Sequence, residues 1–117
     1  MDKADLEGRT KAFAVEVITF VGGLPRSRVS NVLGNQLLRS GTSVGANYRE
    51  ANRAASRSDF THKVSIAEKE AAETRYWLEL LDAVDLGDRQ IRAGLLRESN
   101  ELIAIFTSIG RSLRNKK

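Results

Sequence analysis

The chain has 117 residues, of which 41% are hydrophobic and 29% are charged, with a net charge of +4 and no cysteine. This length suits one domain and is too short for two. The balance of apolar and charged residues is typical of a globular chain and argues against disorder. The absence of cysteine excludes disulfides and thiolate metal sites. We therefore expect a single domain over residues 1–117.

The sequence shows no sign of a membrane span or an export signal. The most apolar stretch near the N-terminus, residues 12–21, contains Glu16 and Thr19 and is too short to cross a membrane. The first five residues are acidic and lack the basic region that opens a signal peptide. We expect a soluble, cytoplasmic protein with no membrane partner.

Glycine, proline and capping residues divide the chain into four segments. At the first break a glycine is expected to take a left-handed cap, and Pro25 suits the first turn of the next helix. At the second break Ser58 or Asp59 can cap a helix, and at the third Gly87 ends one helix and Asp88 caps the next. The helices expected from these breaks cover residues 4–21, 26–57, 59–84 and 88–113.

Each segment carries an apolar stripe whose members are three or four residues apart, the spacing of one buried helix face. A repeat of this kind is typical of helices that cross at about 20°. Short connections make sequential helices antiparallel. The sequence thus predicts an all-α fold, an antiparallel up-down-up-down four-helix bundle. The expected core positions are Leu6, Phe13, Val17 and Phe20; Leu33, Leu37, Ser40, Val44, Asn47, Ala51 and Ala54; Phe60, Val64, Ala67, Ala71, Thr74, Leu78 and Leu81; and Ile91, Leu95, Leu102, Phe106, Ile109 and Leu113.

The second segment is unusual because it contains Gly34, Gly41 and Gly45. A glycine inside a helix costs about 1 kcal/mol relative to alanine. Small residues four apart allow another helix to approach closely, so we expect a tight backbone contact around Gly41 to Gly45. The contact could lie within the domain or between subunits, and the alternative is that a long helix simply tolerates these glycines.

The third segment has a second stripe on another face, formed by Ile66, Glu70, Glu73, Trp77, Leu80 and Val84. A helix with two apolar faces is buried on two sides, and a second subunit is the simplest partner for the second face. We expect Trp77, Ile66, Leu80 and Val84 at a subunit interface, with Trp77 near its centre because tryptophan is enriched there. The alternative is a monomer in which Trp77 is partly exposed.

Charge alternates along the chain. Residues 26–57 carry six basic and one acidic residue, a net charge of +5, whereas residues 58–88 carry three basic and eight acidic residues, a net charge of −5. These neighbouring segments should attract each other, and Arg39 and Glu73 are the candidates for a structural polar pair. Such pairs contribute about 0–1 kcal/mol when exposed, but they set register and partner choice.

Residues 89–117 carry seven basic and two acidic residues, a net charge of +5. A basic surface attracts the phosphates of RNA or DNA. Cations near a helix C-terminus also complement the helix dipole, so a solvated helix end is the alternative explanation. The candidate nucleic-acid contacts are Arg89, Arg92, Arg97, Arg111 and Arg114, joined by Arg49, Arg53 and Arg57.

Residue patterns for catalysis or metal binding are lacking. The single histidine, His62, lies three residues after Asp59, a spacing found in di-iron bundles, but those sites need two such pairs and further carboxylates. No nucleophile motif accompanies His62. The stretch 41–45 has two glycines but no lysine of the kind that a phosphate loop needs. We expect no enzyme, no bound metal and no cofactor.

Two blocks of residues in the second and third segments resemble the four-helix bundle proteins known as 23S ribosomal RNA intervening-sequence proteins. The blocks are Leu38-Arg39-Ser40, Ser43-Val44, Asn47 and Glu50-Ala51, and then Ser58, Phe60, Ile66-Ala67, Glu70-Ala71, Glu73-Thr74 and Tyr76-Trp77-Leu78. The resemblance implies a bacterial, cytosolic homopentamer without a firm function. A related protein, the accessory variability determinant of diversity-generating retroelements, is a basic pentameric barrel that binds nucleic acid and a reverse transcriptase.

These observations favour a non-catalytic homo-oligomer that binds RNA or DNA non-specifically through its basic surface. The link to nucleic acid through the related protein is analogy. The alternative function is a protein–protein interaction scaffold or adaptor that does not bind nucleic acid.

Overall fold

The structure is a computed structural model that describes residues 1–115. Four helices follow one another as α1 (Lys3–Gly22), α2 (Arg28–Asn52), α3 (Arg57–Ala83) and α4 (Arg89–Arg114), and the described residues contain no strand. The prediction of an all-α fold with four helices is confirmed.

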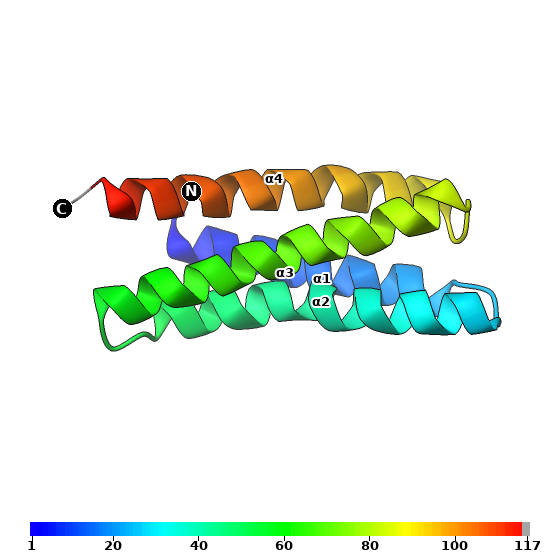
Figure 1. The fold of residues 1–117 in the computed structure, drawn as a ribbon, viewed down its shortest axis with the longest axis horizontal. Helices are drawn as coiled ribbons and strands as arrows, with labels where there is room; N and C mark the ends of the chain where they lie inside the picture. Colours follow the sequence, from blue (N-terminus) through cyan, green and yellow to red (C-terminus); the bar gives the residue numbers. More distant parts are fainter. Residues whose placement is uncertain (116–117) are drawn as a thin grey trace.

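The helices form a bundle of 49 × 21 × 20 Å (Figure 1). Helix α2 packs against α1 and α3, and α4 packs against α3 and α1, so α1 and α3 lie diagonally across the bundle. The α1–α2 and α3–α4 turns lie at one end, which we call the turn end. The α2–α3 connection and the end of α4 lie at the other, which we call the terminal end.

Each helix begins with a side-chain cap. Ser27, Ser56 and Asp88 each accept a hydrogen bond from the backbone N–H three residues later, and Asp2 forms a reciprocal capping box with Asp5. The prediction for Asp88 is confirmed. The prediction of Ser58 or Asp59 as a cap is wrong.

The second and third helices differ most from the expected ranges, because α3 begins earlier than predicted. Ser56 has extended backbone angles and caps α3, so Ser58 and Asp59 lie inside the first turn of α3. Helix α2 accordingly ends at Asn52, five residues before the expected end at residue 57. Pro25 precedes the cap of α2 rather than opening that helix.

The α3–α4 turn contains the positive-φ residues of the described chain, Asp85 (φ 51°) and Gly87 (φ 86°). Two constraints favour glycine at position 87. Its φ is positive, and a Cβ there would lie 2.5 Å from Phe20 Cζ. The turn thus closes over the core at the turn end. Gly23, which ends α1, has a φ of −92°, so the expected left-handed cap at the first break is wrong.

The predicted stripes supply most of the core. All four expected positions of α1 are buried, and so are Leu37, Ser40, Val44 and Ala51 of α2, every expected position of α3 after Phe60, and Leu95, Leu102 and Phe106 of α4. The remaining positions are half-buried at the edge: Leu33, Asn47, Ala54, Phe60, Ile91, Ile109 and Leu113. Thr10, Tyr48, Arg92 and Ser99 are buried but were not expected.

Helices α1 and α2 approach closely at the glycines of α2. A Cβ at Gly41 would lie 2.9 Å from both Cγ1 and Cγ2 of Val17, and one at Gly45 would lie 3.1 Å from Thr10 Oγ1. The expected tight contact is confirmed, and it lies within the domain. None of the four helices combines the length and the apolar character that crossing a membrane would need.

The glycine contact leads to a stability prediction. Gly41→Ala should destabilise the fold by about 1–3 kcal/mol, because Val17 is short, β-branched and fully buried and cannot move aside cheaply. This cost should exceed the roughly 1 kcal/mol that alanine contributes through helix propensity. Urea unfolding measures the difference.

Gly8→Ala is the matched control, because Gly8 is a helical glycine of α1 with no atom within 4 Å of the position that a Cβ would occupy. This variant should be as stable as the wild type or more stable by up to about 1 kcal/mol. A Gly41→Ala protein as stable as Gly8→Ala would contradict the close packing of α1 on α2.

Candidate interaction surfaces

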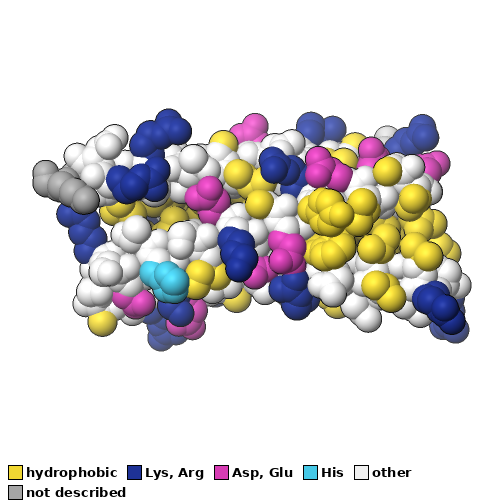
Figure 2. All heavy atoms as spheres, in the orientation of Figure 1, with side chains coloured by type: hydrophobic (Ala, Val, Ile, Leu, Met, Phe, Trp, Pro, Cys, Tyr) yellow, Lys and Arg dark blue, Asp and Glu magenta, His cyan; other side chains and the backbone are white. Residues whose placement is uncertain are grey.

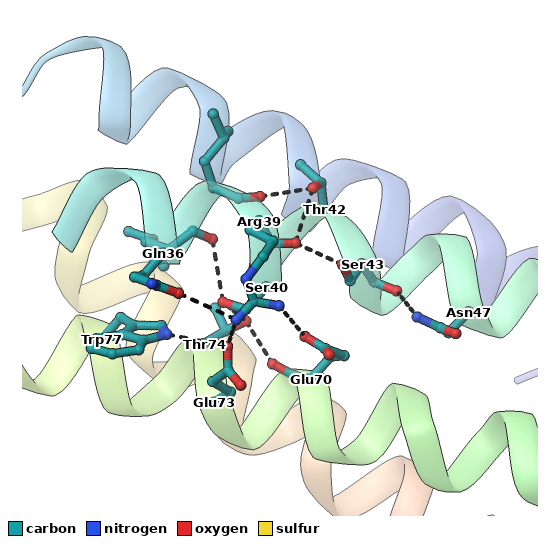
Figure 3. A network of polar contacts seen from close by, with 12 residues as sticks. Gln36, Arg39, Ser40, Thr42, Ser43, Asn47, Glu70, Glu73, Thr74 and Trp77 are labelled. Carbon is teal, nitrogen blue, oxygen red and sulfur yellow. Dashed lines mark hydrogen bonds and ion pairs between the residues drawn. The ribbon is translucent and has the colours of Figure 1, made fainter. Parts of the chain in front are cut away.

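A polar network joins α2 to α3 on the surface of the bundle (Figure 3). Arg39 forms ion pairs with Glu73 and with Glu70, the latter at 3.4 Å between Nη1 and Oε2. Glu73 Oε2 also accepts a long hydrogen bond of 3.4 Å from the indole Nε1 of Trp77. The predicted pairing of Arg39 with Glu73 is present. Because the Arg39 side chain is 51% exposed, this pairing orients side chains more than it stabilises the fold.

Beneath this network lies a buried hydroxyl pair. Thr74 Oγ1 donates to Ser40 Oγ at 2.9 Å, linking α3 to α2 inside the core. Each hydroxyl also lies near a carbonyl oxygen of its own helix, Glu70 for Thr74 at 2.7 Å and Leu37 for Ser40 at 3.4 Å. The pair therefore favours this register of α2 on α3, although neither hydroxyl depends on it alone for a partner. Asn47, by contrast, donates to the carbonyl of Ser43 in its own helix.

The second stripe of α3 continues the network with apolar side chains. Trp77 packs against the core and is half-buried, Ile66 and Leu80 are also half-buried, and Val84 is 57% exposed. Figure 2 shows a broad apolar area on the visible face toward the turn end. One subunit thus covers only part of this stripe.

The large exposed apolar side chains have a common location. Apart from Met1, they lie in the half of the bundle nearer the turn end, in the second half of α1, the first turns of α2 and the last third of α3. These side chains are Val15, Ile18, Val29, Val32, Tyr76 and Val84.

On the opposite side of the bundle, α1 and α4 are joined by an ion pair. Arg9 Nε and Nη2 donate to the two carboxylate oxygens of Glu98 at 2.6 and 2.7 Å, and this pairing raises the pKa of Arg9. Nearer the terminal end, an apolar cleft of about 650 Å³ lies between the two helices. Its walls include Leu6, Tyr48 and Phe60, and burial raises the pKa of the Tyr48 phenol.

Arg92 does not belong to the basic surface, which corrects the sequence prediction. Its side chain is 2% exposed, and its guanidinium donates to Asp82 and Asp85 at 2.8 Å each and to the carbonyl oxygens of Leu86 and Gly87. These bonds raise the pKa of Arg92 and lower the pKa of Asp85. Arg92 is therefore a structural residue that holds the α3–α4 turn, and its donors are not available to a phosphate.

The other predicted arginines lie at several places along the bundle. Arg89 lies at the turn end, 3.8 Å from Asp85, and Arg97 is exposed in the first half of α4. Arg53, Arg57, Arg111 and Arg114 gather at the terminal end, where α2 ends, α3 begins and α4 ends. Arg49, in the last turn of α2, is 54% exposed and lies 4.0 Å from Glu7. We call Arg53, Arg57, Arg111 and Arg114 the basic end.

A pocket of about 550 Å³ opens at the basic end between the first turns of α3 and the last turn of α4. We call it the α3–α4 pocket. The sequence marked His62 only as a poor metal ligand and gave no reason to associate it with the arginines. The residues that line the pocket are Arg57, Ser58, Thr61, His62, Ser65, Leu113 and Arg114. Within residues 1–115, no group of three or more His, Asp or Glu side chains is arranged to hold a metal ion.

The chain is similar to known proteins in both sequence and fold. The sequence profile of the 23S rRNA-intervening sequence protein family matches residues 4–108. The chain belongs to this family. A crystal structure of a protein of unknown function from the S23 ribosomal protein family of Bacteroides thetaiotaomicron is similar, with a TM-score of 0.86 and 39% sequence identity. The alignment covers 95% of this chain and 99% of that one. No curated protein matches the sequence.

The role of Arg92 can be tested by Arg92→Met, which keeps an apolar side chain in the site and removes the donors. The carbonyl oxygens of Leu86 and Gly87 would lose their partner, so the free energy of unfolding should fall by about 2–4 kcal/mol. Arg97→Met, an exposed change in the same helix, should alter it by less than about 0.5 kcal/mol. Equal stability of the two variants in urea would refute the structural role.

The same variant should change the response to acid. Because Arg92 holds the pKa of Asp85 below its usual value, the carboxylate stabilises the fold above the unfolded-state pKa of about 3.9. That contribution is lost as the pH falls through the lower, folded-state pKa. The stability of Arg92→Met should therefore decline less steeply than that of the wild type on acidification below about pH 4, as followed by urea unfolding at a series of pH values.

Proposed function

We propose that this antiparallel up-down-up-down bundle assembles with copies of itself, as a homopentamer, and binds RNA or DNA non-specifically and without catalysis through its basic end. The observation that supports this proposal is the placing of the exposed apolar side chains and of the basic end along the 49 Å bundle, although Arg26, Arg28 and Arg89 also lie at the turn end. Exposed apolar side chains occupy the half near the turn end, and four arginines gather at the terminal end.

The apolar side chains favour self-association into a ring. Val15 and Ile18 belong to α1, whereas Tyr76 and Val84 belong to the end of α3, and α1 and α3 are diagonal in the bundle. Apolar side chains on different sides, with Val29 and Val32 of α2 between them, suit a contact in which one side of each copy meets another side of the next copy. Contacts of this kind close into rings when the rotation between copies allows it. The number five follows from the resemblance to the family.

A ring of this kind would multiply the basic end. If copies associate through the half near the turn end with the same orientation, every basic end lies on the same side of the ring. Several weak phosphate contacts on one polyanion then add up through effective concentration. The arginines of one subunit need not bind tightly for the assembly to hold nucleic acid.

Association can be tested with Val84→Glu. Val84 is 57% exposed, so the change should leave the fold intact, but it places a charge on the second stripe of α3. Light scattering behind size exclusion should give five times 12.9 kDa for the wild type and a smaller mass for Val84→Glu. Ser112→Glu, an exposed change near the terminal end, should keep the wild-type mass. A wild type that stays monomeric at high concentration would overturn the ring.

Nucleic-acid binding can be tested by its dependence on salt. For the wild type, the logarithm of the affinity for duplex DNA should fall linearly with the logarithm of salt concentration, with a slope of about −0.9 per phosphate contact. Arg53→Gln and Arg111→Gln should each weaken binding and make this slope shallower by about one contact.

Arg89→Gln is the matched control for these changes, because Arg89 lies at the turn end and the same charge is removed. Its slope should equal that of the wild type in fluorescence anisotropy between about 50 and 200 mM salt. Binding that does not weaken with salt, or equal effects of all three substitutions, would argue against phosphate contacts at the basic end.

The apolar cleft between α1 and α4 favours the second candidate, a protein-interaction scaffold. A cleft of about 650 Å³ with mainly apolar walls could hold an apolar side chain of another polypeptide. This alternative predicts a co-purifying polypeptide that nuclease treatment does not release. It also predicts an absorbance ratio at 260 and 280 nm that shows no carried nucleic acid.

A further inference from the structure

The α3–α4 pocket concentrates hydrogen-bond donors of positive or neutral character. Arg57, Ser58 and His62 come from the first two turns of α3, and Arg114 comes from the last turn of α4. Among residues 1–115, no carboxylate lines the pocket. The N-terminus of α3 adds the partial positive charge of its helix dipole at the same place. The pocket therefore favours an anion.

One contact places an arginine along the wall of the pocket. Arg57 Nη2 donates to the carbonyl oxygen of Leu113 at 2.9 Å, which ties the start of α3 to the end of α4. Arg114 folds back along its own helix, and its Nη1 lies 3.5 Å from the position that a Cβ on Gly110 would occupy. The Arg114 guanidinium thus lies beside Gly110 at an ordinary van der Waals distance.

The hydroxyl groups of the pocket have different roles. Thr61 donates to the carbonyl oxygen of Arg57 at 2.9 Å, and Ser65 donates to that of His62 at 2.7 Å, so both hydroxyl protons are engaged within α3. The donors that remain to face a ligand include the guanidinium of Arg114, the imidazole of His62 and the hydroxyl of Ser58.

We propose that the α3–α4 pocket binds a phosphate monoester, such as the terminal phosphate of an RNA or DNA strand. A monoester presents three oxygens and a charge of about −1.5 to −2 near neutral pH. A phosphodiester inside the strand presents two such oxygens and a single charge. Three donor side chains from two helices match the larger number of acceptors, and arginine can bind a phosphate through two parallel hydrogen bonds.

The volume and place of the pocket agree with this ligand. About 550 Å³ is within the range of small-molecule sites and exceeds the volume of a phosphate alone, so the attached sugar can enter as well. The pocket lies at the basic end, where the rest of the strand would meet Arg53 and Arg111. The role at a strand end rests on the proposed function, whereas binding of the monoester itself depends only on the pocket.

His62 provides a direct test because it is the only histidine in the chain. The NMR signals of its ring can be followed without ambiguity while the full-length protein is titrated at one fixed pH. Thymidine 5′-monophosphate should shift these signals to saturation, and thymidine should not. An oligothymidylate with a 5′-phosphate should shift them more than the same oligonucleotide with a 5′-hydroxyl. Its affinity, measured by anisotropy with a 3′ label, should be about tenfold higher, which one charge-assisted hydrogen bond can supply.

Two substitutions on the same helix separate the pocket from the general basic surface. Arg114→Gln should remove the His62 response to the nucleotide. It should also abolish the preference for the 5′-phosphate, so that the two oligonucleotides bind with about equal affinity. Arg111→Gln removes the same charge one turn earlier but does not line the pocket. It should weaken the binding of both oligonucleotides equally and keep both the preference and the His62 response.

The outcomes distinguish this inference from the proposed function. Salt-dependent binding of both oligonucleotides with equal affinity and no specific His62 response would overturn the inference and leave the proposed function standing. A His62 response to the nucleotide without any salt-dependent binding of oligonucleotides would support the pocket and refute the proposed function. Equal His62 shifts with thymidine and its monophosphate would refute phosphate recognition.

Discussion

The close approach of α1 to α2 is the constraint on which the shape of the bundle depends. Gly41 and Gly45 present no Cβ, so Val17 and Thr10 of α1 fill the space against the backbone of α2. On its other side, helix α1 is linked to α4 by the bidentate pair of Arg9 and Glu98, and apolar and mixed grooves of about 650 and 320 Å³ lie between these two helices. The glycines of α2 thus account for the tight side of the bundle.

The basic residues of the chain divide between folding and surface charge. Arg92 is buried and pairs with the exposed carboxylates of Asp82 and Asp85, and it stabilises a turn in which Asp85 has a positive φ. Arg39 orients Glu73 and Glu70 beside Trp77. The net charge of a segment therefore overstates the surface available to a polyanion. The basic end combines residues of the α2–α3 connection with residues from the end of α4, far apart in the sequence.

Much of the core follows from the sequence because the heptad spacing records which face of each helix is buried. The same spacing also marks buried positions that are polar. Continuing the stripe of α4 back from Leu95 and forward to Leu102 passes through Arg92 and Ser99, both of which are buried. A search for hydrophobic residues misses such positions. Arg92 can be buried because the turn between α3 and α4 brings its hydrogen-bond partners around it, and the sequence does not show that these residues meet.

The end of α2 and the α3–α4 pocket depend on tertiary contacts that local sequence patterns do not record. Ser56, Ser58 and Asp59 are all good capping residues, and only the path of the chain decides that Ser56 takes the role. His62 and Arg114 are 52 positions apart in the sequence, so no spacing rule could place them in one pocket. Helix periodicity predicts faces, whereas the meeting of two helix ends depends on helix lengths and turn geometry.

The distance between the exposed apolar side chains and the basic end has an energetic consequence, although Arg26, Arg28 and Arg89 lie at the turn end. Burying an arginine in a subunit contact costs several kcal/mol unless it is well paired, so a contact surface and a phosphate-binding surface compete when they overlap. Here they lie toward opposite ends of a 49 Å bundle, whereas salt screens exposed charges beyond about 8–10 Å. Repulsion among the basic ends of neighbouring copies would therefore reach the apolar half only weakly. Association through apolar side chains and attraction of a polyanion can each proceed without weakening the other, which is what a ring that carries nucleic acid would need.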